Sequence, residues 1–195
     1  MDWTHGKSLA EYLMRADSDD VRGVTFTLPG SGVPVPPLYP HQKEALNRLS
    51  RHPDSAILHL PTGSGKTRIA LEFIARVLRD NPQTRIVWAS YPTTLIRQAM
   101  VRLAQFSGQL PAGLTFTWAK SSAASRSRSA LFDNDIVFVL RGTLSGLLSD
   151  VSDRANSSPL RRLLSDGIPL VVIYDECHQL GAPRLQRGWR VLDRK

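Results

Sequence analysis

Four short apolar runs recur along the chain, and the stretches between them include segments with helical spacing. The runs occupy residues 56–60, 85–90, 136–140 and 170–174, and each is too short for a typical helix. Residues 68–78 instead place apolar side chains three and four positions apart, as one buried face of a helix requires. Strands that alternate with helices predict an α/β fold with a mainly parallel sheet and helices on both faces.

A glycine-rich segment, Leu-Pro-Thr-Gly-Ser-Gly-Lys-Thr at 60–67, lies where the first run gives way to the helical stretch. Its glycines allow backbone N–H groups to turn toward a phosphate chain, and the helix start adds the positive end of its dipole. The alternative is a turn that binds nothing, but the strand–loop–helix context favours a nucleoside-triphosphate site that takes ATP and Mg²⁺. In such a site the lysine reaches the β- and γ-phosphates and the last hydroxyl holds Mg²⁺. The predicted cofactor-binding residues are Pro61, Thr62, Gly63, Ser64, Gly65, Lys66 and Thr67, with Thr67 also a metal ligand.

Two carboxylates follow the run at 170–174, where open α/β sheets place their ligands. Asp175 is predicted to hold Mg²⁺, through water, and Glu176 to orient and deprotonate the attacking water. Together with Lys66 they are the catalytic candidates. A solvated acidic strand end is the alternative, which the upstream phosphate loop disfavours.

These two motifs together resemble those of superfamily-two helicases and translocases. The loop has Leu60 where the general pattern begins with glycine, a departure that is similar to the nucleotide loop of that superfamily. Asp-Glu-Cys-His at 175–178 is similar to its motif II, in the DECH spelling of this DEAD/DEAH-like group. The resemblance implies the first RecA-like domain of a helicase motor, of the restriction-subunit branch.

A glutamine upstream of the loop resembles the adenine-reading residue of the same helicases. Residues 38–46 are similar to the "R-x-Y-Q-x-x-A" opening of type I and type III restriction subunits, although the arginine is missing from its usual place. Gln42 would pair with the N6 and N7 edge of adenine, and Tyr39 would pack against the base. The alternative is an exposed glutamine on an amphipathic helix.

Two further strand ends resemble segments that contact the nucleic-acid backbone in this family. One follows the run at 85–90 and is similar to motif Ia; the other follows the run at 136–140. Threonine hydroxyls and free N–H groups at a helix N-terminus are good phosphate donors, although an ordinary strand-to-helix turn has the same appearance. The residues implied are Pro92, Thr93, Thr94, Arg97, Gln98 and Thr143.

The amino-acid composition indicates what kind of partner the protein binds and in which cellular compartment it is expected. The net charge of +8 favours polyanions, and with the motifs it predicts a nucleic-acid partner, for which DNA is favoured. The single cysteine excludes an internal disulfide and a four-ligand cysteine-rich zinc site, so a reducing cytoplasm is expected. The amino terminus does not have the pattern of a secretory signal, and no apolar run approaches the ~20 residues of a membrane helix, so no membrane partner is expected.

The chain divides into an N-terminal extension with a Pro/Gly-rich connector at 1–37 and an ATP-binding domain at 38–195. Motors of the family resembled hydrolyse ATP between two RecA-like domains, and no second domain is expected within these residues. We therefore expect the ATP-binding domain of a nucleic-acid-dependent ATPase, a DNA helicase or translocase, for which restriction or phage defence is one setting. It would hydrolyse ATP within a complete motor and be inactive or weakly active alone. The alternatives are a stand-alone nucleotide-dependent nucleic-acid-binding module and a truncated regulator of a complete helicase.

Overall fold

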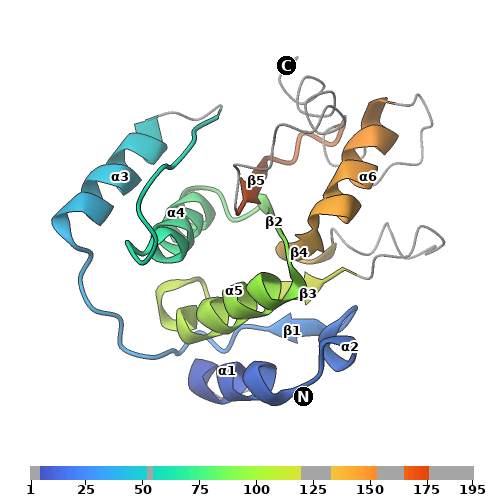
Figure 1. Ribbon diagram of the computed structural model, residues 1–195, viewed down its shortest axis with the longest axis horizontal. Helices are drawn as coiled ribbons and strands as arrows, with labels where there is room; N and C mark the ends of the chain where they lie inside the picture. The colour runs from blue at the N-terminus through green and yellow to red at the C-terminus, as the bar shows by residue number, and fades with distance from the viewer. Residues whose placement is uncertain (1–4, 52–54, 120–132, 153–164, 176–195) are drawn as a thin grey trace.

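A computed structural model describes residues 5–51, 55–119, 133–152 and 165–175, and within them a five-stranded sheet flanked by helices (Figure 1). Along the chain the elements are α1 (Gly6–Arg15), α2 (Ser18–Val21), β1 (Thr25–Thr27), α3 (Pro40–Arg51), α4 (Lys66–Asp80), β2 (Arg85–Ser90), α5 (Thr93–Gln105), the 3₁₀ turn η1 (Ser107–Gln109), β3 (Thr115–Trp118), β4 (Ile136–Leu140), α6 (Arg141–Ser152) and β5 (Leu170–Tyr174).

The sheet is mainly parallel, as the alternation of strands and helices predicts. Its strand order is β1-β3-β4-β2-β5, so β2 lies between β4 and β5. Strands β3, β4, β2 and β5 are parallel to their neighbours, and only β1 joins the edge antiparallel, against β3. The predicted α/β class is therefore confirmed.

Side-chain alternation along the strands separates two packed faces. Trp88 and Phe138 lie opposite each other in β2 and β4 and belong to the main core cluster, which also holds apolar residues of α1, α4 and α5. Val87 and Val137 come one position earlier in the same strands, so their side chains point away from that cluster. Helix α6 contacts β4 and β2, and none of its described residues belongs to the main cluster. Helices thus cover both faces, because successive strand residues point to opposite sides.

The N-terminal extension is part of this core. Leu9, Leu13 and Phe26 are buried in the same cluster as the sheet, and α1 lies along α5 (Figure 1). The connector is also hydrogen-bonded to this core. The backbone N–H of Gly6 and the hydroxyl of Ser107 both donate to the carbonyl oxygen of Ser31. The motifs begin after residue 37, but the described residues before it share the hydrophobic core of the domain.

The predicted buried strand at 56–60 is wrong. This segment is extended but belongs to no strand; Leu58 and Leu60 are half-buried against α3 and α4, whereas the side chain of Ile57 is 76% exposed. An apolar run becomes a strand only where a neighbouring strand supplies hydrogen bonds. No strand pairs with it among the residues that the structure describes.

Within the described ranges, no helix has both the length and the apolar character that a bilayer span requires.

Candidate nucleotide and nucleic-acid site

The glycine-rich loop leads directly into α4, whose first residue is Lys66. Gly65 is the N-cap of α4 with φ 85°, and Gly63 has φ 80°, so both occupy the left-handed region that side chains disfavour. No side chain caps the helix, and its first turn carries no acidic residue. The positive end of the α4 dipole is therefore not neutralised from within the helix, which suits an anion.

Three hydrogen bonds donated by side chains of the loop end on backbone oxygens of the same loop. The Lys66 ammonium donates to the carbonyl oxygens of Leu60 and Pro61, at 3.1 and 3.2 Å. The Ser64 hydroxyl donates to the same Pro61 oxygen at 2.7 Å. Lys66 therefore already points into the turn formed by its own loop, where a phosphate would compete with two carbonyl oxygens for its charge.

Gln42 ties this loop to α3. Its Nε2 donates to the carbonyl oxygen of Ser64 at 3.0 Å, and its Oε1 accepts from the backbone N–H of Tyr39 at 3.0 Å. The side chain is buried, and an added Cβ at Gly65 would collide with its Nε2. Gln42 is therefore not an exposed surface residue, and both ends of its amide are engaged by the protein.

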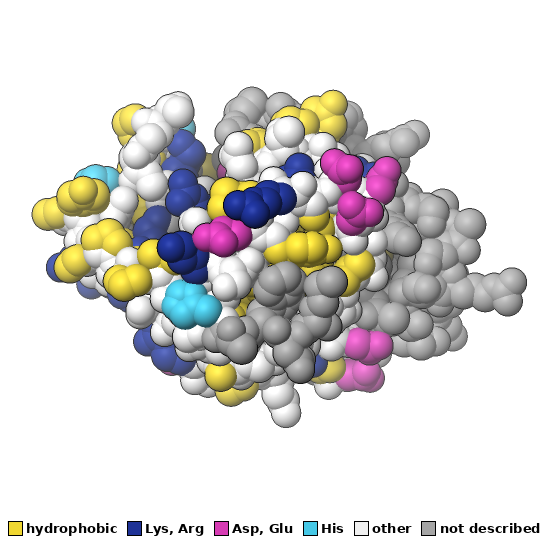
Figure 2. All heavy atoms as spheres, turned by 90° about the horizontal axis from the view of Figure 1, so that it is seen from below, with side chains coloured by type: hydrophobic (Ala, Val, Ile, Leu, Met, Phe, Trp, Pro, Cys, Tyr) yellow, Lys and Arg dark blue, Asp and Glu magenta, His cyan; other side chains and the backbone are white. Residues whose placement is uncertain are grey.

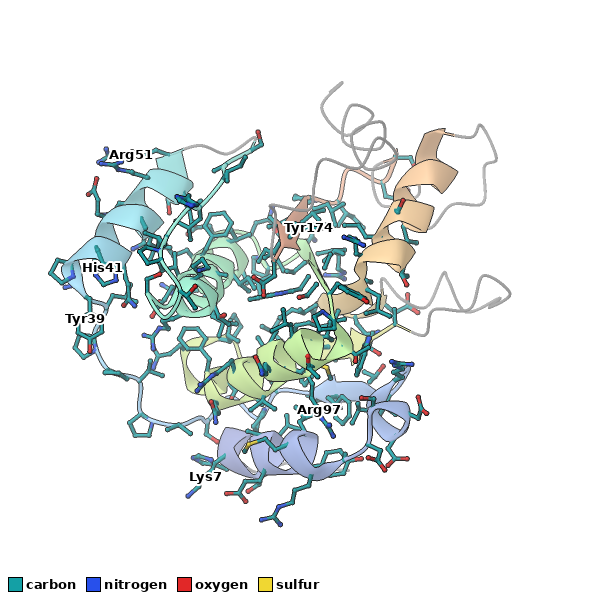
Figure 3. All side chains as sticks on the ribbon, viewed as in Figure 1. Lys7, Tyr39, His41, Arg51, Arg97 and Tyr174 are labelled. Carbon is teal, nitrogen blue, oxygen red and sulfur yellow. The ribbon has the colours of Figure 1, made fainter. Side chains whose placement is uncertain are left out.

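Tyr39 lies beside this contact with an exposed ring. Its side chain is 66% exposed and stacks on the ring of His41, with centroids 5.9 Å apart and planes 6° apart (Figure 3). A ring nitrogen of His41 is 3.3 Å from the Ser64 carbonyl oxygen, so the stacked pair adjoins the phosphate loop. Sequence reasoning missed His41; its position one residue before Gln42 on the same helix was the available signal.

Asp175 directly follows the edge strand β5. Its backbone N–H donates to the carbonyl oxygen of Ala89 at 2.9 Å, so the ladder with β2 extends one residue past the strand. Ile173 packs against the cluster that contains α4, and alternation places Asp175 on that same face. The phosphate loop and Asp175 thus belong to the same side of the sheet. Glu176 and the rest of the DECH motif lie outside the described residues.

The two predicted backbone-contact segments begin neighbouring helices. Ser90 and Leu140 lie opposite each other at the ends of parallel strands β2 and β4, so the starts of α5 and α6 are adjacent. Thr93, Thr94 and Gln98 belong to α5, Thr143 belongs to the first turn of α6, and Pro92 is the N-cap of α5 without a side-chain hydrogen bond. Pro92, Thr93, Thr94 and Thr143 therefore follow the carboxyl ends of neighbouring strands, and Gln98 lies one turn further along α5.

Arg97 has a structural partner. Its Nε donates at 2.9 Å to the carbonyl oxygen of Leu13, 84 residues earlier, at the end of α1 (Figure 3). The guanidinium thereby joins α5 to the N-terminal extension. Nothing in the local sequence indicates this partner.

The positive charge of the chain is partly paired and unevenly spread. Figure 2 shows Lys and Arg gathered toward the α3 side of one face and acidic side chains toward the α2 side. Several arginines are neutralised locally; those at 3.5 Å or less from a carboxylate oxygen are Arg22, Arg48, Arg68 and Arg85. The net charge alone therefore does not locate a nucleic-acid surface. Across the described residues, no three His, Cys, Asp or Glu side chains gather as a metal cluster.

Sequence reasoning also missed Tyr91 and Arg141 at the edge where α5 and α6 begin. The Arg141 guanidinium carbon lies 5.4 Å from the centroid of the Tyr91 ring. An aromatic residue directly after a buried strand was the signal that could have found the pair.

Comparison with known proteins identifies one family. The family model described as "Type III restriction enzyme, res subunit" matches residues 36–193. Neither the curated proteins nor the solved structures give a significant match. The matched range contains the glycine-rich loop, Asp175 and both helix starts, and leaves residues 1–35 outside.

Proposed function

The chain belongs to the type III restriction enzyme res-subunit family of superfamily-two helicases, and from this premise we propose that it binds ATP with Mg²⁺ to drive work on nucleic acid. The family match supports a helicase-like ATPase domain with a RecA-like fold. Two observations carry the proposal: the uncapped α4 N-terminus is preceded by two left-handed glycines, and Asp175 is assigned to the same side of the sheet as α4.

The residues present fit a nucleotide and its metal ion. Backbone N–H groups at the start of α4 suit the phosphate chain, and Lys66 needs only to exchange its two carbonyl partners for phosphate oxygens. The Thr67 hydroxyl and the Asp175 carboxylate are hard oxygen donors of the kind Mg²⁺ prefers. When bound, Mg²⁺ neutralises charge that develops on the β- and γ-phosphates. Glu176 would hold and deprotonate the attacking water.

The two residues predicted to contact adenine, Tyr39 and Gln42, take different roles. Tyr39 offers an exposed ring next to the loop, which suits stacking on the base. Gln42 positions the loop through Ser64, and it can pair with adenine only by exchanging its bonds to the protein. We therefore assign stacking to Tyr39 and loop placement to Gln42.

DNA is the favoured nucleic acid, and a second RecA-like domain would complete the catalytic cleft. The side-by-side starts of α5 and α6 support a phosphate-contacting edge formed by Thr93, Thr94 and Thr143. A second domain would supply the arginines that stabilise the transferring phosphoryl group, worth about 10³–10⁵ in rate where such arginines are measured. Restriction or phage defence in the cytoplasm is the setting that the family favours.

The test is nucleotide binding by the purified chain, with Lys66→Ala as the variant and Lys7→Ala as the matched control on α1. A fluorescent ATP analogue with Mg²⁺ should bind the parent and the Lys7 variant equally, and the Lys66 variant much more weakly. Equal affinity for all three would contradict the loop assignment. Binding measurements on the isolated chain then separate the alternatives. ATP-gated DNA binding by the chain alone favours a stand-alone binding module, and an intact loop without nucleotide affinity favours a regulator.

A further inference from the structure

An exposed tyrosine with an arginine over its ring lies at the carboxyl edge of the sheet. The side chain of Tyr91 is 54% exposed, and Arg141 lies 5.4 Å from its ring centroid. The neighbouring aromatic residues of the strands, Trp88 and Phe138, are by contrast fully buried. Tyr91 therefore contributes little to the core, and its ring is available at the surface.

The pair is held by rigid elements on both sides. Tyr91 directly follows β2, and Arg141 directly follows β4 as the first residue of α6. The last residues of these two parallel strands, Ser90 and Leu140, are in register and partly or fully buried. Because each residue follows a paired strand end, the two side chains are brought together by the sheet rather than by a flexible loop. Such placement lowers the entropy lost when a ligand binds.

The surroundings suit a nucleic-acid strand. Immediately after Tyr91, α5 begins at Thr93 with no side-chain cap, and α6 begins beside it. Helix N-termini favour phosphate, whereas an exposed aromatic ring and a guanidinium plane favour the flat face of a base. In a duplex the bases are stacked on one another, so only an unpaired base can cover such a ring.

We propose that Tyr91 and Arg141 form a stacking platform for an unpaired nucleobase, so that this edge takes single-stranded nucleic acid. The proposal rests on the proposed nucleic-acid function and specifies the strand state of its ligand. The neighbouring threonines contact phosphates whatever the sequence, and Tyr91 adds a contact that requires a base. Stacking of one base on an aromatic side chain corresponds to roughly 5- to 140-fold in affinity.

The first experiment compares two labelled oligomers of equal length and charge by fluorescence anisotropy. One is an oligo-dT strand and the other is an abasic strand with the same phosphates. The parent chain should bind oligo-dT more tightly. Tyr91→Ala should weaken oligo-dT roughly 5- to 140-fold while leaving the abasic strand unchanged, and Tyr91→Phe should retain the parent affinity. Met14→Ala, at a similarly exposed apolar residue of α1, is the control expected to change neither.

The outcomes separate this inference from the proposed function. Equal binding of both strands by the parent, or equal loss for both in Tyr91→Ala, overturns the platform while nucleic-acid binding stands. Binding of neither strand contradicts the nucleic-acid function and the platform together. Duplex binding that depends on Tyr91 as strongly as oligo-dT binding also overturns single-strand selection.

A measurement on the unaltered chain covers the case in which Tyr91→Ala does not fold. Oligo-dT that contains 5-iodouracil is irradiated with the parent chain, and the crosslinked peptide is identified by mass spectrometry. Crosslinking at Tyr91 supports the platform. Efficient crosslinking confined to other residues contradicts it.

Discussion

Two glycines of the phosphate loop provide a matched pair of substitutions whose costs should differ. Gly63 and Gly65 have nearly the same positive φ, 80° and 85°, so alanine is strained at either position. An added Cβ at Gly63 has no atom within 4 Å, whereas at Gly65 it would collide with Nε2 of Gln42. Any difference between the two alanine variants therefore reports the contact with Gln42.

The expected magnitudes follow from these contacts. The left-handed conformation costs a non-glycine residue about 1–2 kcal/mol, which applies to Gly63→Ala and Gly65→Ala alike. In Gly65→Ala the Gln42 side chain must also move, losing its hydrogen bonds to Ser64 and Tyr39. At about 0.5–1.5 kcal/mol for each bond, Gly65→Ala should lower the free energy of unfolding by a further ~1–3 kcal/mol.

Urea unfolding followed by tryptophan fluorescence is a suitable assay, because Trp88 and Trp118 are fully buried. Both glycine variants are made in the parent and in a Gln42→Ala background. The excess cost of Gly65→Ala should disappear in that background, because the colliding side chain is gone. Equal costs in the parent, or an excess that persists without Gln42, would refute the assigned contact between α3 and the loop.

Three further substitutions test other contacts. Arg97→Ala should lower the free energy of unfolding by about 1–3 kcal/mol, because a charged donor to the Leu13 carbonyl is lost; an unchanged thermal melt with weakened DNA binding would return Arg97 to a phosphate-contacting role. Asp175→Asn should reduce the gain in nucleotide affinity that Mg²⁺ provides, measured by titration with Mg²⁺ and with EDTA; an undiminished gain would remove Asp175 from the metal site. Glu176→Gln should keep nucleotide binding but stop turnover in a complete motor, and turnover at the parent rate would exclude Glu176 as the base.

Features set by short stretches of chain could be predicted from the sequence. Short apolar runs predicted β2, β4 and β5, and the segments between those runs predicted helices. Both predictions hold because side-chain periodicity is a property of the local backbone. The same holds for the phosphate loop, since Gly63 and Gly65 adopt the positive φ that only glycine tolerates well. The rule that parallel strands deliver their ends to one edge accounts for Asp175 following β5 at the carboxyl edge of the sheet.

The tertiary structure decided which partners each side chain meets. The run at 56–60 has the composition of a strand, yet no strand pairs with it in the described part of the chain, and Ile57 is exposed. Arg97 donates a hydrogen bond to the carbonyl oxygen of Leu13, 84 positions away. The Gln42 side-chain amide is hydrogen-bonded to Ser64 and Tyr39. Hydrogen bonds and buried contacts depend on where distant segments pack, whereas conformational preference and periodicity act within a few residues. The sequence by itself therefore determined the fold class and the glycine conformations of the loop, and only the assembled structure determined which polar groups hold that loop in place.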